Sequence, residues 1–92
     1  MPVEIAWSPL ARARLQEIRA FVALDKPDAA EHLAIRIVAL VEALRNSPYL
    51  GRAGVEPGIR ELVVGGTPYL ILYRIRRDKL LILTITQGAQ RK

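Results

Sequence analysis

The chain has no cysteine and a single histidine among its 92 residues. Without cysteine there is no disulfide, no thiol nucleophile and no thiolate metal ligand, and a small fold without covalent cross-links suits a reducing cytoplasm. The one histidine, His32, falls in a predicted helix and has no second ligand near it in the pattern. A solvent-facing or locally hydrogen-bonded histidine is the simplest interpretation, so we expect no metal and no cofactor.

Long apolar runs and a phosphate-binding loop are also missing. No segment reaches the roughly 18 apolar residues of a membrane span, and MPVEIAWSP lacks the basic region, apolar run and cleavage site of a signal peptide. The pair Gly65-Gly66 has neither the spacing nor the following helix of a phosphate loop and is typical of a hairpin turn. We therefore expect a soluble cytoplasmic protein with no membrane partner.

Acidic residues are scarce in the C-terminal half. Residues 1–46 carry six basic and six acidic side chains, whereas residues 47–92 carry eight basic and three acidic ones, which is the whole net charge of +5. This asymmetry predicts an anionic partner, either a nucleic acid or an acidic polypeptide. A solvated basic face without a partner is the alternative interpretation.

The pattern of apolar residues predicts two helices between one strand and three more. Residues 3–7 alternate as a half-buried strand, and Ser8 and Pro9 are typical of the start of a helix, here over about 9–24. Pro27 restarts a second helix, with Asp25 as its cap, that extends to about residue 46. Further strands are expected over 59–64, 69–76 and 80–86.

This order predicts an α+β fold of one domain over residues 1–92, with β-α-α-β-β-β topology. The short connection makes the helices an antiparallel hairpin, which covers one face of a mainly antiparallel four-stranded sheet. The opposite face then has no cover within the chain, although both central strands carry apolar residues on both faces. Such a partly apolar face is typical of a binding surface.

One metal-free chemistry stays open at this point, which is RNA cleavage by positioned cations. Arginines would stabilise charge on the phosphate while a tyrosine, histidine, lysine or glutamate moves protons. The available side chains are Arg60, Arg74, Arg76, Arg91, Tyr49, Tyr69, Tyr73 and Lys92. The alternatives are an ion pair of Glu61 beside Arg60 on the strand surface, worth under about 1 kcal/mol, and tyrosines packed in the core.

Several short motifs follow one another along the chain. They are Trp7-Ser8-Pro9, Ala29-Ala30, Gly51-Arg52, Arg60-Glu61-Leu62, Pro68-Tyr69, Tyr73-Arg74-Ile75, and Gln87-Gly88 with Arg91. In this order they resemble the RelE/ParE family of bacterial toxins from type II toxin–antitoxin modules. The likeness spans the whole chain and is closer to the ParE branch than to the RelE branch.

The resemblance implies a small cytoplasmic toxin that a cognate antitoxin neutralises. The antitoxin would have a DNA-binding N-terminal domain and an acidic, apolar C-terminal segment that wraps the toxin, and the assembly would be a toxin homodimer or a heterotetramer with the antitoxin. The ParE branch is associated with inhibition of DNA gyrase by protein binding, whereas the RelE branch cleaves mRNA in the ribosome.

A departure from the family bears on the choice between these targets. Gln87 stands where many members have histidine, and a glutamine cannot titrate near neutral pH, which argues against a nuclease. A degenerate, non-toxic member would show the same departure. If the protein were an endoribonuclease, Arg60, Arg74 and Arg91 would clamp the phosphate.

Two sets of residues are thus expected to bind partners. The candidates for target binding are Arg52, Arg60, Glu61, Tyr69, Tyr73, Arg74, Gln87, Gly88 and Arg91. The candidates for antitoxin binding are Ile35, Ala39, Leu70, Leu72, Arg74, Arg76, Leu80 and Ile82.

Overall fold

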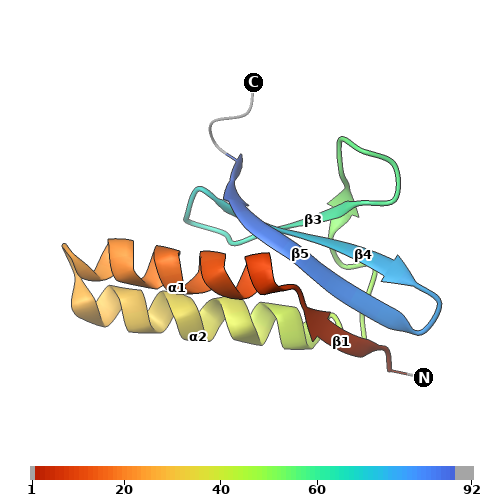
Figure 1. Ribbon diagram of the computed structural model, residues 1–92, viewed down its shortest axis with the longest axis horizontal. Helices are drawn as coiled ribbons and strands as arrows, with labels where there is room; N and C mark the ends of the chain where they lie inside the picture. Colours follow the sequence, from red (N-terminus) through yellow and green to blue (C-terminus); the bar gives the residue numbers. More distant parts are fainter. Residues whose placement is uncertain (1, 89–92) are drawn as a thin grey trace.

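Two antiparallel helices lie against one face of a five-stranded sheet in the computed structural model, which describes residues 2–88 (Figure 1). The helices are α1 (Pro9–Ala23) and α2 (Pro27–Ala43). The strands are β1 (Glu4–Trp7), β2 (Arg52–Ala53), β3 (Arg60–Val63), β4 (Tyr69–Arg76) and β5 (Lys79–Gln87), ordered β1-β5-β4-β3-β2 in the sheet.

Within residues 2–88, β1 pairs with β5 in parallel, while the other neighbouring strands pair antiparallel. The predicted α+β class and the helical hairpin on one sheet face are confirmed. The sheet has one strand more than predicted, because the two-residue β2 pairs with β3. No helix in residues 2–88 is long and apolar enough to cross a membrane.

The two helices begin differently. The hydroxyl of Ser8 accepts a hydrogen bond from the Ala11 N–H at 2.9 Å, and Pro9 occupies the first turn of α1, as predicted. The N-cap of α2 is Lys26, which makes no side-chain cap hydrogen bond, so the assignment of Asp25 as the cap is wrong. Pro27 in the first turn is enough to start this helix, because its missing N–H costs nothing there.

The hydrophobic core fills the space between the helical hairpin and the sheet. Its fully buried side chains come from α2 and its C-terminal end and from the helix-facing side of β4 and β5, and include Ile37, Val41, Leu44, Ile71, Tyr73, Leu80, Ile82 and Ile85. Burial of each such aliphatic side chain stabilises the fold by about 1.5–3 kcal/mol. Contacts of α1 with β5 complete this layer.

A β-bulge interrupts the ladder between the two longest strands. Leu72 pairs with Thr84 and the next residue, Tyr73, pairs with Ile82, so Leu83 has no partner across the ladder. A bulged residue leaves a backbone group without a ladder hydrogen bond. The Leu83 carbonyl instead accepts a hydrogen bond from the hydroxyl of Ser8 at 2.7 Å. One serine therefore caps α1 and ties it to the irregular point of β5.

The bulge decides which side chains of β5 face the helices. Because the alternation skips one residue, Leu80, Ile82 and Ile85 all lie in the core, each 1% exposed or less. Leu80 and Ile82 are therefore not available to a partner, and their assignment to an antitoxin-binding surface is wrong. Leu81, 38% exposed, lies on the open face instead.

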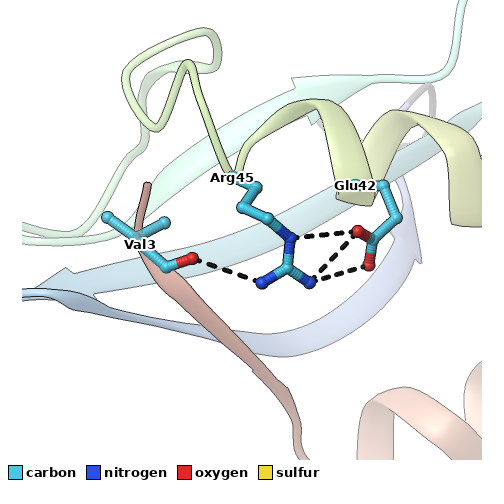
Figure 2. A network of polar contacts seen from close by, with 3 residues as sticks. All are labelled: Val3, Glu42 and Arg45. Atoms are coloured by element: carbon cyan, nitrogen blue, oxygen red, sulfur yellow. Dashed lines mark hydrogen bonds and ion pairs between the residues drawn. The ribbon is translucent and has the colours of Figure 1, made fainter. Parts of the chain in front are cut away.

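Arg45 attaches β1 to the end of α2 (Figure 2). The N–H of Val3 donates to the Arg45 carbonyl at 2.9 Å, and Nη1 of Arg45 donates to the Val3 carbonyl at 3.4 Å. The same guanidinium pairs with Glu42 at 3.1 Å. The chain thus leaves the helix at Ala43, earlier than the predicted residue 46, and turns so that Arg45 reaches the first strand.

Tyr73 joins the core to the loop that follows α2. Its ring is fully buried, and its hydroxyl donates to the Pro48 carbonyl and accepts from the Gly51 N–H, both at 2.8 Å. A Cβ on Gly51 would lie 2.7 Å from that hydroxyl, so glycine is required for the approach. Arg60 donates to the Gly51 carbonyl at 2.6 Å and lies over the Tyr49 ring, 5.1 Å from its centroid. The loop is therefore held rigidly on the core.

Removal of the Tyr73 hydroxyl should destabilise the protein. Tyr73→Phe leaves the Pro48 carbonyl and the Gly51 N–H without their partner, so we expect the free energy of unfolding in urea, followed by circular dichroism, to fall by about 1–3 kcal/mol. Tyr69→Phe is the matched control, because the Tyr69 hydroxyl makes no hydrogen bond to any residue in 2–88. Equal losses in the two variants would contradict this role of Tyr73.

Candidate functional site

The face of the sheet opposite the helices contains a hollow of about 790 Å³. We call it the open-face hollow, and it is lined by Arg52, Val55, Glu56, Ile59, Glu61, Leu70, Leu72, Thr86 and Gly88. Strands β3, β4 and β5 form its floor, while β2 and the loop between β2 and β3 form one wall. Its lining joins aliphatic side chains to charged ones of both signs.

Strand register places the floor residues on this face. Leu72 lies between Ile71 and Tyr73, which are both in the core, so its side chain points away from the helices. Its neighbour across β3 is Glu61, and the neighbour of Leu70 across β5 is Thr86. The predicted open, partly apolar sheet face is therefore present.

Glu61 is part of the floor and is only 5% exposed. Nε of Arg52 lies 3.2 Å from its Oε1, and the Arg52 side chain is itself 64% exposed. The expectation of a surface ion pair beside Arg60 is wrong, because adjacent residues of a strand point to opposite faces. A carboxylate buried this deeply needs a charged or hydrogen-bonding partner, and β2 supplies one across the ladder.

Gly88 allows the end of β5 to lie across Leu70. Its N–H donates to the Pro68 carbonyl at 2.7 Å, and a Cβ at this position would overlap the Leu70 side chain. For this reason Leu70 is only 5% exposed although it lies on the open face. Glycine in the family motif Gln87-Gly88 thus has a packing role here, with Gln87 half-buried beside it.

The predicted phosphate clamp does not assemble within residues 2–88. Arg60 pairs with Tyr73 in the ladder and shares its helix-facing side, whereas Arg74 lies on the open face opposite Leu81. The guanidinium of Arg60 is occupied by the Gly51 carbonyl. Arg91, the third member of the clamp, lies outside the described residues.

The two other tyrosines differ in what they can reach. Tyr69 is 6% exposed and packs in the core, as the alternative interpretation expected. Tyr49 is 68% exposed on the loop that Tyr73 holds, beside Leu50, which is 54% exposed. Val55, in the loop between β2 and β3, is 79% exposed. The predicted sites include Tyr49 only as a side chain for RNA cleavage and do not include Leu50 or Val55, although apolar side chains among turn residues are a signal of binding.

The residues predicted to bind an antitoxin fall into two separate regions. Leu70, Leu72, Arg74 and Arg76 lie on the open face or at its end. Ile35, 60% exposed, and Ala39 lie on α2, where Ile35 lines a groove of about 360 Å³ between the two helices. A single partner can reach both regions only by wrapping around the molecule. Within residues 2–88, no three His, Asp or Glu side chains gather into a metal site.

Two bacterial proteins, described as "Putative toxin Y4kP" and "Toxin RelE2", match the chain over nearly its whole length. Y4kP of Sinorhizobium fredii is 44% identical over 86 residues, which are 94% of this chain and 88% of Y4kP. Toxin RelE2 of Caulobacter vibrioides is 31% identical over 87 residues, which are 95% of this chain and 97% of RelE2.

Solved toxin–antitoxin structures share the fold. The chromosomal ParDE system from P. aeruginosa contains a chain with a TM-score of 0.85 and 25% identity, and the match covers 92% of this chain and 95% of that one. The RelBE2 complex from Mycobacterium tuberculosis matches with a TM-score of 0.68 and 19% identity, over 95% of this chain and 99% of that one. The second likeness concerns the fold alone.

A family profile agrees with these matches. Described as "ParE toxin of type II toxin-antitoxin system, parDE", it covers residues 5–91. The resemblance noted in the motifs is thereby confirmed, and the chain belongs to the ParE family of toxins of type II toxin–antitoxin systems.

Proposed function

We propose that this toxin acts by binding DNA gyrase as a protein partner and is neutralised by a cognate antitoxin in the cytoplasm. The observation that carries the proposal is the placement of Arg60 and Arg74 on opposite faces of the sheet. Two guanidinium groups that point away from each other cannot clamp one phosphate. The arrangement supports recognition of proteins over cleavage of RNA.

The loop held by Tyr73 is the surface that we propose for the target. Tyr49 and Leu50 are exposed there, and the Arg60 guanidinium lies over the Tyr49 ring. Tyrosine and arginine are enriched at the energetic centres of protein interfaces. Because the loop is already fixed by the Tyr73 hydroxyl, little conformational entropy is lost when it binds.

The open-face hollow is the surface that we propose for the antitoxin. Its floor is aliphatic at Leu72, and Arg74 places positive charge on the same face beyond the hollow. An extended segment with apolar and acidic side chains would match both features. The solved relatives are described as a ParDE system and a RelBE2 toxin–antitoxin complex, which supports an antitoxin partner for this chain.

One observation favours the alternative of an mRNA endoribonuclease. Glu61 and Arg52 lie together in a hollow of the size of a ligand pocket, where a carboxylate and a guanidinium could act on a phosphodiester. Gln87, which cannot exchange a proton near neutral pH, remains the argument against it.

Tyr49 should be required for gyrase inhibition. We expect Tyr49→Ala to lower the potency of the purified toxin against supercoiling by the gyrase of its own host by about tenfold or more, because it removes an exposed aromatic anchor. Leu24→Ala is the control, since Leu24 is 86% exposed at the end of α1, away from the loop. A wild-type toxin that leaves supercoiling intact but cleaves mRNA, as judged by primer extension after induction, would establish the alternative.

Reversal of the charge at Arg74 should weaken antitoxin binding. Arg74→Glu places a carboxylate beside the proposed path of an acidic segment. We therefore expect the dissociation constant for the antitoxin, measured by calorimetry, to rise by roughly tenfold to a hundredfold, and to change less with salt concentration than that of the wild type. Arg12→Glu is the matched control, because Arg12 is an exposed cation on α1. Equal effects of the two reversals would show that only net charge matters, and would contradict a site on the open face.

A further inference from the structure

The outer edge of β1, at one end of the sheet, can pair with a further β-strand. The N–H groups of Glu4 and Ser8 donate to the carbonyls of Asp78 and Ile82 at 2.8 and 2.9 Å. In a strand, alternate residues turn their backbone groups to opposite sides, so those of Ile5 and Trp7 point away from β5. They form no hydrogen bond with any residue in 2–88. Unpaired groups at a sheet edge are a template for another strand.

Both ends of this edge are closed. Arg45 occupies the N–H and the carbonyl of Val3, as Figure 2 shows for the side-chain contact. At the other end Pro9 begins α1 and has no N–H to donate. An incoming strand can therefore pair only with Ile5 and Trp7.

We propose that the edge pairs with β1 of a second copy of this chain, in antiparallel orientation, with the two-fold axis at Ala6. In this register Ile5 of one copy exchanges two backbone hydrogen bonds with Trp7 of the other. The two-fold axis repeats this between Trp7 of the first copy and Ile5 of the second. Four hydrogen bonds then use every free backbone group of the two edges. Centring the axis at Ile5 would place Trp7 opposite Val3, whose groups Arg45 already holds.

The side chains of β1 suit this self-pairing. Ile5 and Trp7 are half-buried against the core on the helix side, so the second copy would cover apolar surface that its own chain leaves exposed. Ala6 is exposed on the open face and is small enough to face its own copy across the axis. Aromatic and β-branched residues in opposite positions of an antiparallel pair stabilise it.

Charge favours a second copy at this edge. The cations beside it are matched, because Lys79 lies 3.9 Å from Glu4 and Arg45 lies 3.1 Å from Glu42. The excess positive charge includes Arg74 and Arg76 on the open face and at its end, where another copy would be repelled. The paired segment is short, so we expect a weak dimer whose population rises with protein concentration.

Charge variants at Ala6 test the axis. In sedimentation velocity of the full chain, Ala6→Glu and Ala6→Lys should each weaken dimerisation by about fivefold or more, because like charges then face each other across the axis. An equimolar mixture of the two variants should recover the dimer. Ala53→Glu is the matched control, since Ala53 is an exposed alanine in the strand at the opposite edge, and it should dimerise like the wild type.

A cross-link gives a second measurement. The Ala6 pair would be directly opposed without hydrogen bonds, at a Cα separation of about 4.5 Å, which is within the range of a disulfide. Because the chain has no cysteine, Ala6→Cys should form one specific covalent dimer on oxidation, whereas Ala53→Cys should not. The proposal is overturned if the wild type stays monomeric at all concentrations, or if the mixed charge variants fail to associate. Protection of the Ile5 and Trp7 amides from hydrogen exchange only with antitoxin present would also overturn it and would assign the edge to the antitoxin.

Discussion

One helical hairpin can cover only one face of a five-stranded sheet, and the organisation of this toxin follows from that constraint. The hairpin buries the side of β4 and β5 that carries Ile71, Tyr73 and Ile82. The other side of the same strands is left to the solvent and to partners. Because β4 is apolar on both faces over much of its length, burial of one face exposes aliphatic floor on the other, and the open-face hollow is the result.

Tyr73 shows how the covered face controls the exposed surface. Its ring belongs to the core, but its hydroxyl reaches through to Pro48 and Gly51 in the loop beyond. Arg60 adds a second attachment at the Gly51 carbonyl. Two side chains that were candidates for chemistry are thus used to fix a loop, and what they present to a partner is the exposed ring of Tyr49. This arrangement supports the proposed recognition of a partner at a rigid surface.

The helices, the other four strands and the open face could be predicted from periodicity and turn residues, because those signals act over a few neighbouring residues, but the two-residue β2 could not. The open-face residues of β4 could be predicted from the alternation, but those of β5 on the N-terminal side of the bulge at Leu83 could not. A bulge has no reliable sequence signature, and one extra residue moves Leu80 and Ile82 from the face expected for them into the core. Glu61 was misplaced for a related reason, since its partner Arg52 comes from a strand of two residues that has no periodicity to detect.

The sequence by itself determined the class of the fold, the helical hairpin whose two helices each begin at a proline, the family, and the basic character of the C-terminal half. Each depends on residue type and spacing, which are present in the unfolded chain. Only the tertiary structure decided which arginines share a face, which tyrosine is free, and which edge of the sheet is left unpaired. These follow from ladder register and from long-range contacts such as Ser8 with Leu83 and Arg45 with Val3. Contacts between residues so far apart along the chain exist only once the sheet and the helices have packed together.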